Sequence, residues 1–386
     1  MKISLKRTPE QIELVKAMAS RNRDVAYEAQ VALAAFLGPV LAEVINNAPV
    51  LSNLFSPLSF NAEDNPSLPL DLYYDITDED YIQVYSQSVA GGLPTNQVLP
   101  TTSEMKITTY TLDSALSFDK RYAAKSRMDV VSKTFTRMAQ EILAKQERTS
   151  GNLILGALAA ASTNGKKHVQ RANAVGRFLL QDMNELLTLS RRVFTSFTGG
   201  TKVDGQSGMG ITDLLISPEI EEEIRSMAYN PINSKGVLAT TPDGSNPGIA
   251  APDSVRVGLF NGSGVSSFYG VNLMVFNEFG YGRKFNDIFD TLASSTAYTK
   301  ADGTGSNAFG ASNYDELVLG INRNRESLIR AVAVDSESGS EFTLVADDQY
   351  SIRQNKIGYF GSLEEGRMVL DNRALFGKIV NRTTTS

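Results

Sequence analysis

The alternation of hydrophobic and polar residues first predicts a helical segment and then an extended one. Residues 1–55 are predicted to be mostly helical, because apolar side chains recur at steps of four, three and four: Val25, Ala29, Ala32 and Phe36. Thr8 followed by Pro9 predicts an N-cap with proline at the first helical position. From Leu51 to Leu72 the chain has three prolines and little periodicity. This stretch is predicted to be an extended arm that needs another element to pack against.

A long hairpin is predicted over Leu72–Leu112. Polar and apolar residues alternate in "DYIQVYS", and Gly91-Gly92 with Pro94 marks the turn. The return strand places one set of side chains on one face: Thr108, Tyr110, Leu112, Leu116 and Phe118. An isolated two-stranded hairpin is marginal in water, so this one is predicted to lie on a neighbouring element or subunit. The residues predicted to make that contact are Tyr81, Val84, Tyr85, Val89, Gly91, Gly92 and Leu93.

A long helix is predicted next. An apolar stripe recurs at steps of three and four through Met128, Val131, Phe135, Met138 and Ile142, with Leu153 further along it. The absence of Pro and Gly from Ala123 to Ser150 allows about seven turns. The rest of this helix is basic. Its surface is predicted either to be simply solvated or to face a polyanion, in a sequence-independent electrostatic contact through Lys125, Arg127, Lys133, Arg137 and Lys145.

The remaining pattern favours the α+β class. Helical and strand-like segments alternate between residues 166 and 313, with a helix expected in "RFLLQDMNELLTLSRRVF", and strands dominate from Glu316 onward. This is not the strict strand–helix alternation of a doubly wound sheet.

The segment "ITDLLISPEIEEEI" predicts a buried strand that runs directly into a helix. Ser217 occupies the N-cap position and Pro218 the first helical position. The buried face of the helix is predicted to contain Ile220, Ile224 and Met227. Four carboxylates lie in the first two turns, where the helix dipole stabilises negative charge: Glu219, Glu221, Glu222 and Glu223. With no His or Cys nearby to converge on them, a structural role is favoured over a catalytic or metal-binding one.

Composition narrows the possible functions. The 386 residues are 42% hydrophobic and 21% charged, with a net charge of −6, which is typical of a globular protein. Because the chain has no cysteine, disulfides, thiolate nucleophiles and cysteine-bound zinc are excluded. The single histidine, His168, lies in the basic stretch "NGKKHVQR" and is predicted to be solvated. The stretch "VALAAFLGPVLAEVI" is too short and interrupted for a membrane span, so no membrane association is expected and the protein is predicted to be intracellular.

No catalytic, cofactor or metal site is predicted. Motifs for dinucleotide or phosphate binding lack the required spacing, and a serine triad would depend on His168. One acidic group is either exposed at the hairpin base or able to bind a hard cation: Asp75, Asp78, Glu79 and Asp80. The chain is therefore predicted not to be an enzyme.

In the order and spacing of these elements the chain resembles the major capsid proteins of tailed double-stranded DNA phages with the Hong Kong 97 fold. The arm, the hairpin, the long helix and "DLLISPEIEEEI" follow in the family's order. Val271-Asn272-Leu273 resembles a strand segment of the family, and the stretch Val369–Phe376 resembles its closing pattern.

The resemblance implies a division of the chain. Residues 1–71 would be the helical segment and arm, and 72–112 the hairpin. Residues 113–165 with 334–372 would form a peripheral domain containing the spine helix. Residues 166–333 with 373–386 would form an axial domain.

The resemblance also implies a function. Copies would assemble as pentamers and hexamers into an icosahedral virion capsid, formed in the host cytoplasm, with the hairpin over a neighbouring subunit and the basic helix near packaged double-stranded DNA. A separate scaffolding protein is expected, because few residues precede the arm, together with a portal and decoration or cement proteins. The only lysine between Leu72 and Leu112 is Lys106, near the hairpin base, so covalent crosslinking of subunits is not expected.

Two alternatives stay open. An encapsulin, a bacterial compartment of the same fold, would enclose a cargo enzyme in place of a genome. A hydrolase that uses acidic residues would need two carboxylates facing one cleft.

Overall fold

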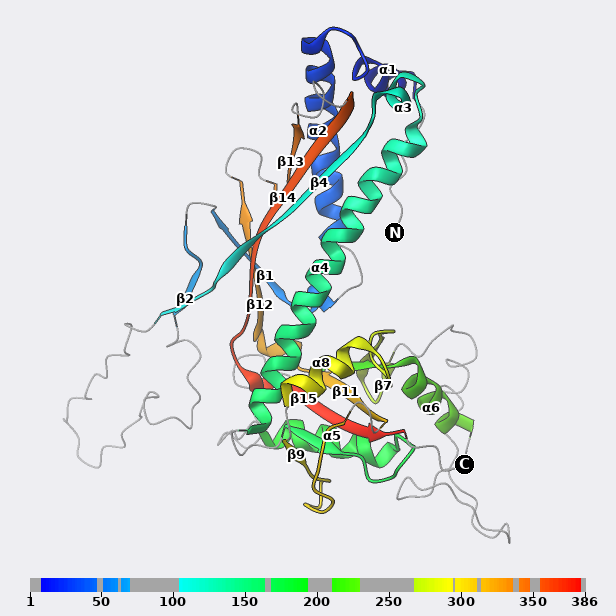
Figure 1. Cartoon of the computed structure of the whole chain (residues 1–386). Coiled ribbons are helices and arrows are strands. Elements are labelled where there is room, and N and C mark those ends of the chain that lie inside the picture. The colour runs from blue at the N-terminus through cyan, green and yellow to red at the C-terminus, as the bar shows by residue number, and fades with distance from the viewer. Residues whose placement is uncertain are drawn as a thin grey trace, which may run out of the picture. The chain divides into compact units, whose positions relative to one another are not determined.

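The computed structural model describes eleven stretches of the chain: residues 8–46, 51–61, 64–69, 104–163, 168–193, 210–229, 267–293, 296–310, 314–335, 340–347 and 355–382. They belong to two compact units (Figure 1). Unit 1 comprises residues 1–73, 100–150 and 328–368, and unit 2 comprises residues 74–99, 151–327 and 369–386. Each contains helices and a sheet with both parallel and antiparallel pairs, which confirms the α+β class.

Unit 1 begins with the predicted helices. The helical elements are α1 (Pro9–Ala17), α2 (Arg23–Asn46), the 3-10 turn η1 (Leu51–Leu54), α3 (Lys120–Ala124) and the part of α4 (Met128–Thr163) up to Ser150. The N-cap of α1 is confirmed, because the Thr8 hydroxyl accepts a hydrogen bond from the Gln11 amide at 3.4 Å and Pro9 begins the helix.

One sheet lies against these helices. Its strands are β1 (Ser56–Asn61), β12 (Leu328–Val334), β14 (Lys356–Val369), β13 (Thr343–Asp347) and β4 (Thr109–Asp119). The order is β1-β12-β14-β13, with β4 also paired to β14. A separate pair, β2 (Ser67–Pro69) and β3 (Glu104–Lys106), joins the residues that flank 70–103.

The arm predicted over Leu51–Leu72 is partly wrong. Ser56–Asn61 does not wait for an outside partner, because it forms β1 and pairs in parallel with β12 from Ser56↔Ile329 to Asn61↔Val334. The prolines misled the prediction. Pro57 is tolerated because β1 is an edge strand, where a missing amide hydrogen can point away from the neighbouring strand.

The return strand of the hairpin has the predicted inner face. Tyr110, Leu112, Leu116 and Phe118 are buried or half-buried on β4, whereas Thr108 precedes the strand and is exposed. Within the described residues, β4 pairs with β14 over its whole length, from Thr109↔Gly366 to Asp119↔Lys356.

The long helix begins later than predicted. A short helix, α3, ends at Ala124, and α4 starts at Met128 after a turn in which Ser126 has a φ of 50°. Asp119 caps α3 by accepting the Arg121 amide at 2.9 Å. The absence of Pro and Gly therefore did not ensure one continuous helix, because the left-handed Ser126 separates α3 from α4.

The apolar stripe of α4 is confirmed and packs into the unit 1 core. Its five members are all buried: Met128, Val131, Phe135, Met138 and Ile142. Leu153 is only half-buried, and Ile154 and Leu155 take the inward positions further along. Tyr359 of β14 lies at the centre, with its ring 5.2 Å from that of Phe135 and 6.4 Å from that of Phe118.

Unit 2 is built on a six-stranded sheet of order β5-β15-β11-β6-β8-β7. Its strands are β5 (Val169–Arg171), β15 (Leu375–Asn381), β11 (Asp315–Ile321), β6 (Asp213–Ile216), β8 (Val271–Val275) and β7 (Ser267–Phe268). Its helical elements are α5 (Leu180–Val193), α6 (Pro218–Tyr229), α8 (Lys284–Ala293), η4 (Arg323–Arg325), η5 (Asn372–Ala374) and the rest of α4. A small pair, β9 (Ala297–Tyr298) and β10 (Asn307–Ala308), completes the described part.

Helices cover both faces of this sheet. Residues of α5 and α6 share one core cluster with side chains of β6, β11 and β15, such as Leu214, Val318 and Phe376. On the other face Gly377 of β15 lies close to Leu158 of α4. The predicted strand–helix unit is confirmed as β6 and α6, because the Ser217 hydroxyl accepts the Ile220 amide at 3.2 Å.

His168 is not solvated, so that prediction was wrong. The side chain is 1% exposed, and its ring is stacked on Phe376 with the centroids 5.7 Å apart. Its Nδ1 lies 3.1 Å from the carbonyl oxygen of Leu375, to which it donates. The basic neighbours in the sequence suggested a loop, but His168 directly precedes β5 in the sheet of unit 2.

Two glycines of α4 test the packing of this helix against α8. A Cβ at residue 151 would lie 2.5 Å from the buried ring of Phe285, whereas one at residue 156 would meet Leu292 at 3.9 Å. Gly151→Ala is therefore expected to destabilise the protein by about 1–3 kcal/mol. The matched Gly156→Ala is expected to stabilise it by about 0.5–1 kcal/mol, because alanine favours the helix. Urea unfolding of the unassembled subunit measures both, and equal effects of the two substitutions would contradict the packing.

Candidate functional site

Some of the residues predicted to be functional lie in the described part of the chain, and others lie outside it. The seven hairpin residues lie outside the described residues: Tyr81, Val84, Tyr85, Val89, Gly91, Gly92 and Leu93. The same holds for the acidic group Asp75, Asp78, Glu79 and Asp80. Within the described part of the chain, no group of three His, Asp or Glu side chains could hold a metal ion.

Three of the five predicted basic residues lie on one helix. Lys133, Arg137 and Lys145 are exposed on α4. Arg137 is 74% exposed and donates to Glu141 one turn later, with Nε and Oε1 2.9 Å apart. An exposed pair of this kind contributes little to stability.

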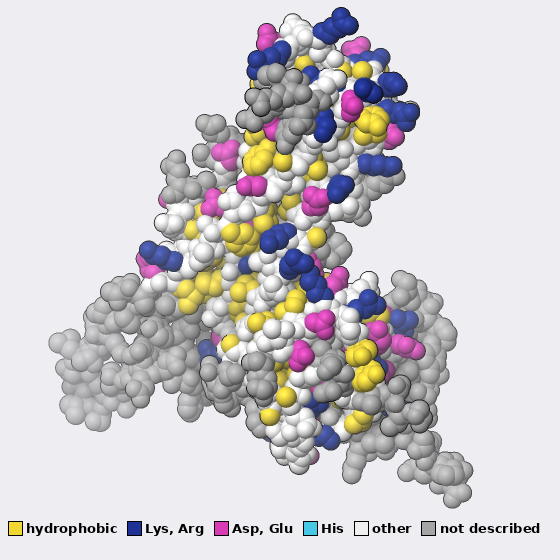
Figure 2. Space-filling view, in the orientation of Figure 1, with side chains coloured by type: hydrophobic (Ala, Val, Ile, Leu, Met, Phe, Trp, Pro, Cys, Tyr) yellow, Lys and Arg dark blue, Asp and Glu magenta, His cyan; other side chains and the backbone are white. Residues whose placement is uncertain are grey.

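The other two, Lys125 and Arg127, lie in the turn between α3 and α4 and are also exposed. Further exposed basic side chains lie on α1, in the turn before α2, at the first residue of α2 and on α3: Lys16, Arg21, Arg23 and Arg121. Figure 2 shows Lys and Arg side chains gathered at the end of unit 1 where α1 and α3 lie. The five residues thus belong to two different surfaces.

Two of the four carboxylates at the start of α6, Glu221 and Glu223, are held in ion pairs, and Glu219 and Glu222 are exposed. Glu221 pairs with Arg225 at 2.9 Å, and Glu223 accepts both the Phe178 amide at 2.6 Å and the Arg382 guanidinium. Arg382 also donates to Glu316 at 2.9 Å. Burial raises the pKa of Glu223 and of Glu316, and in Glu223 the neighbouring Glu316 adds to the effect. These carboxylates neutralise an arginine inside unit 2, which supports the structural interpretation.

A second buried cation in unit 2 is Lys378 of β15, whose side chain is fully buried. Its Nζ lies 2.7 Å from Glu185 and 3.5 Å from Asp182, both on α5. Burial alone would raise the pKa of Glu185, but the bonds from Lys378 and Asn173 lower it below its usual value. These contacts tie α5 to the central strands.

The most connected charged group of unit 1 is Glu365 on β14, which is fully buried. Its Oε2 accepts hydrogen bonds from Arg330, Arg367 and Gln146, each at 3.0 Å. Its Oε1 accepts the Tyr110 hydroxyl at 2.9 Å. The four donors come from strands β12, β14 and β4 and from helix α4, so one carboxylate joins four elements.

Arg367 extends this cluster towards the arm. Its guanidinium donates to the Ser52 hydroxyl at 2.8 Å, to the Gln146 carbonyl at 3.1 Å and to the hydroxyl of Ser150. The same group lies over the ring of Phe55, 5.6 Å from its centroid. The start of the arm is thereby fixed on α4 and β14.

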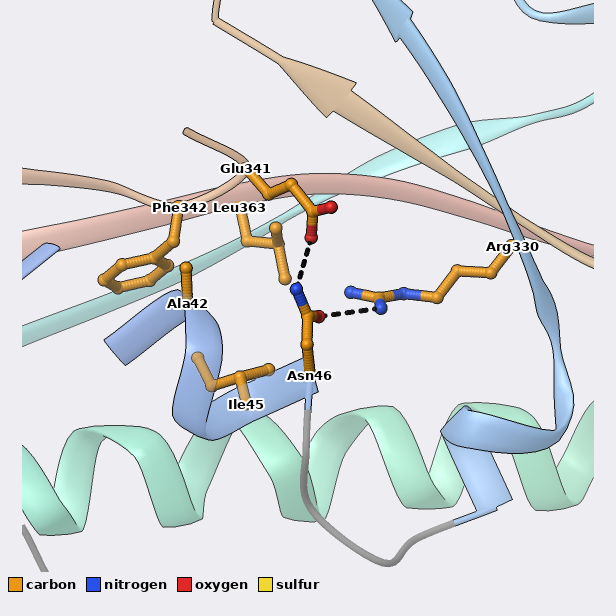
Figure 3. A pocket seen from close by; sticks show the side chains of 7 residues that line it. All are labelled: Ala42, Ile45, Asn46, Arg330, Glu341, Phe342 and Leu363. Carbon is orange, nitrogen blue, oxygen red and sulfur yellow. Dashed lines mark hydrogen bonds between the residues drawn. The ribbon is translucent and has the colours of Figure 1, made fainter. Parts of the chain in front are cut away.

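Arg330 extends the cluster in the other direction, to the end of α2 (Figure 3). Its Nη1 donates to the Asn46 side-chain oxygen at 3.1 Å, and the Asn46 amide nitrogen donates to Glu341 at 2.8 Å. The space beside these residues is too small to hold a water molecule and is otherwise lined by apolar side chains. Ligand pockets usually measure about 300–1,000 Å³, so this space is not a ligand site.

Glu365 is held in its charged form. Burial alone would raise its pKa, but Arg367 and Arg330 together lower it below its usual value. The same surroundings raise the pKa of Tyr110 to about 12, through burial and the adjacent Glu365 charge, so the hydroxyl stays a donor. A charged carboxylate between two guanidinium groups is the state in which the network is complete.

Sequence reasoning missed this cluster. Glu365 and Arg367 occupy inward positions on β14, in step with Ile357, Tyr359 and Leu363. That alternation was the available signal, because charged residues in phase with a buried face must find partners inside. The partners themselves could not be found locally, since Tyr110 is 255 residues away in the sequence.

The cluster can be tested with two adjacent glutamates. Glu365→Gln is expected to destabilise the subunit by about 3–5 kcal/mol, because two buried guanidinium groups lose their counter-charge. Glu364→Gln, on the less buried face of the same strand, is expected to change stability by less than about 0.5 kcal/mol. Denaturant unfolding at neutral pH compares them, and similar losses in both variants would contradict the assigned role.

The same group predicts a pH dependence. The pKa of Glu365 is lower in the folded than in the unfolded state. The contribution of its charge to the stability of the fold is therefore complete at pH values above the unfolded-state pKa. The contribution is lost as pH falls through the folded-state pKa. The stability gap between the unsubstituted protein and Glu365→Gln is therefore expected to narrow on acidification, as unfolding curves below pH 5 would show.

The chain matches no known family model and no curated protein sequence. Its structure is similar to several solved shells. One is the holo-SrpI encapsulin complex from Synechococcus elongatus PCC 7942, at 13% identity and a TM-score of 0.42, covering 87% of this chain and 89% of that one. Another is the capsid of cyanophage P-SCSP1u, at 12% identity and a TM-score of 0.46, covering 86% and 88%. A third is the mature capsid of bacteriophage PhiM1, at 9% identity and a TM-score of 0.45, covering 88% of each chain.

Proposed function

We propose that this chain is a structural shell protein, and specifically the major capsid protein of a tailed double-stranded DNA phage. Copies would form pentamers and hexamers of an icosahedral head. The observation that carries the proposal is the paired stem β2–β3, which is separate from the unit 1 sheet and brackets residues 70–103. The stem has three residue pairs, too few to be stable alone, which supports the prediction that the hairpin lies on another surface. A neighbouring copy would supply that surface.

The interior of the subunit supports a structural role. The carboxylates described above are engaged by arginines inside the subunit: Glu365 by Arg330 and Arg367, and Glu316 and Glu223 by the shared Arg382. A hydrolase using acidic residues would need two carboxylates facing a cleft that admits substrate. The ion pairs instead join elements that are distant in sequence, which gives a rigid building block.

The exposed basic face of α4 would lie near the packaged genome. Lys133, Arg137 and Lys145 carry this part of the proposal, because they are exposed on one helix. A contact of this kind neutralises phosphates without reading the sequence. The other partners would be a separate scaffolding protein, a portal and decoration or cement proteins, with assembly in the host cytoplasm. No covalent bond between subunits is part of the proposal.

Shell formation tests the proposal directly. The full-length protein, expressed with its scaffolding protein, is expected to form closed particles visible by electron microscopy. Deletion of residues 89–95 is expected to leave a subunit with an unchanged melting temperature that no longer forms closed particles. Only monomers or small oligomers from the unsubstituted protein would contradict the shell function. Particles that enclose an enzyme in place of DNA would identify the compartment alternative.

The basic face is tested by the salt dependence of DNA binding. Changing Lys133, Arg137 and Lys145 to glutamine is expected to reduce the slope of log K against log salt by about 2.7, if each neutralises one phosphate. A control with the same loss of charge changes three exposed basic residues elsewhere: Arg191, Arg192 and Lys284. The control is expected to keep the slope of the unsubstituted protein. Equal reductions in both would contradict a specific role for α4.

A further inference from the structure

Among the described residues, only one side of helix α2 is covered, although apolar side chains also lie on the other side. Its inner side packs into the unit 1 core through Ala29, Leu33, Leu37, Leu41 and Ile45. Its outer side exposes two large apolar side chains three turns apart, Val25 at 42% and Phe36 at 53%, together with the smaller Ala32 and Pro39. Tyr27 at 41% and Val31 at 43% are exposed on another flank of the helix. A helix that is apolar all round is usually buried all round, so the outer side is expected to have a partner.

We propose that this outer side docks onto a second copy of the chain, at the basic end of its unit 1. The outer face of α2 is defined here as Val25, Ala32, Phe36 and Pro39 with the carboxylates Glu28 and Glu43, which helical spacing places on one side. The basic end is defined as Arg121, Tyr122, Lys125 and Arg127. This contact deepens the shell function proposed above and rests on it.

The charge of the outer face selects the kind of partner. Glu28 and Glu43 are both exposed, and no Lys, Arg or His occurs from Asp24 to Asn46. The face is therefore apolar with carboxylates only. It repels nucleic acid and favours a partner surface that combines cations with an apolar side chain.

A membrane is a poorer match for the same face. Among the described residues α2 is the one helix long and apolar enough to cross a bilayer, and 44% of its most apolar window is buried inside the protein. Helices that lie on membranes carry Lys and Arg on their polar side, because the membrane surface is negative. The three carboxylates of α2 have the opposite sign.

The basic end supplies the complementary chemistry. Arg121 has a side chain that is 80% exposed, and Lys125 and Arg127 are exposed in the turn that follows α3. Tyr122, 45% exposed, lies among them and gives the apolar contact. Tyrosine and arginine are the residues that most often dominate the energy of protein interfaces.

The geometry of such a contact suits a shell. The two faces are different surfaces of the same unit, so the contact is heterologous and each copy offers one free face of each kind. Repetition of a heterologous contact gives rings or extended assemblies instead of a closed dimer. Pentamers and hexamers are rings of this type.

Charge reversal with rescue tests the contact. Glu28→Lys with Glu43→Lys, and separately Lys125→Glu with Arg127→Glu, are each expected to lower the yield of closed shells by about tenfold, because like charges would face each other in every contact. All four residues are exposed, so the subunit is expected to keep its melting temperature. Combining the two pairs in one chain is expected to restore most of the yield.

A matched control combines the α2 pair with Arg191→Glu and Arg192→Glu, which reverse two exposed cations on α5. This combination is expected not to restore assembly. A photoreactive phenylalanine analogue at position 36 is expected to crosslink, in assembled shells, to a peptide of another copy containing residues 120–128.

Several results would overturn the contact. They are normal shells from the α2 pair, rescue by the control combination, and crosslinks from position 36 to lipid or to a different protein. Each of these results can be obtained only if the unsubstituted protein forms shells. Such a result would therefore contradict the contact and leave the proposed shell function intact. If the unsubstituted protein forms no shells at all, the proposed function fails instead.

Discussion

The structure of unit 1 depends on one buried carboxylate, that of Glu365, held between two arginines. A charge inside a protein is costly unless its partners are close and correctly oriented, and here all the donors lie within 3.0 Å. Those donors come from β12, β14, β4 and α4, and Arg330 and Arg367 extend the network to Asn46 on α2 and Ser52 in η1. This network therefore fixes the start of the arm, the spine helix and the sheet of unit 1 in one arrangement.

Rigidity of this kind matters for a protein whose proposed task is to fit many copies of itself. Unit 2 also contains cations held between carboxylates. Lys378 lies between Asp182 and Glu185, and Arg382 lies between Glu223 and Glu316. These interior charges all meet opposite charges inside their own unit. The charges on the surface of unit 1 have a separate distribution, with carboxylates on the outer face of α2 and cations on α3 and α4. Interior charges hold the elements of each unit together, and the surface charges and exposed apolar side chains are the ones assigned to the proposed neighbours.

Local sequence patterns predicted those elements whose stabilisation is itself local. Thr8 and Ser217 cap the helices that follow them, and the stripe from Met128 to Ile142 is buried as its spacing indicated. The errors arose where a distant segment decides the outcome. Ser56–Asn61 is a strand because β12 lies beside it, and His168 is buried because Phe376 and Leu375 cover it. The division of the long helix at Ser126 rests on a single left-handed residue, which hydrophobic periodicity does not detect.

The sequence by itself determined the α+β class, the order of the elements, the amphipathic spine helix and the absence of cysteine chemistry, because these follow from periodicity, caps and composition. The tertiary structure alone decided which charges meet. Glu365 finds Tyr110 and Arg330 across 255 and 35 residues, and no local pattern specifies such partners. It also decided which side of α2 is covered, since Val25, Ala32 and Phe36 have helical spacing yet are exposed, whereas the side that packs against β13 is buried. Pairing over long sequence separations is a property of the folded chain, and that is why the ion cluster and the exposed face of α2 emerged only from the structure.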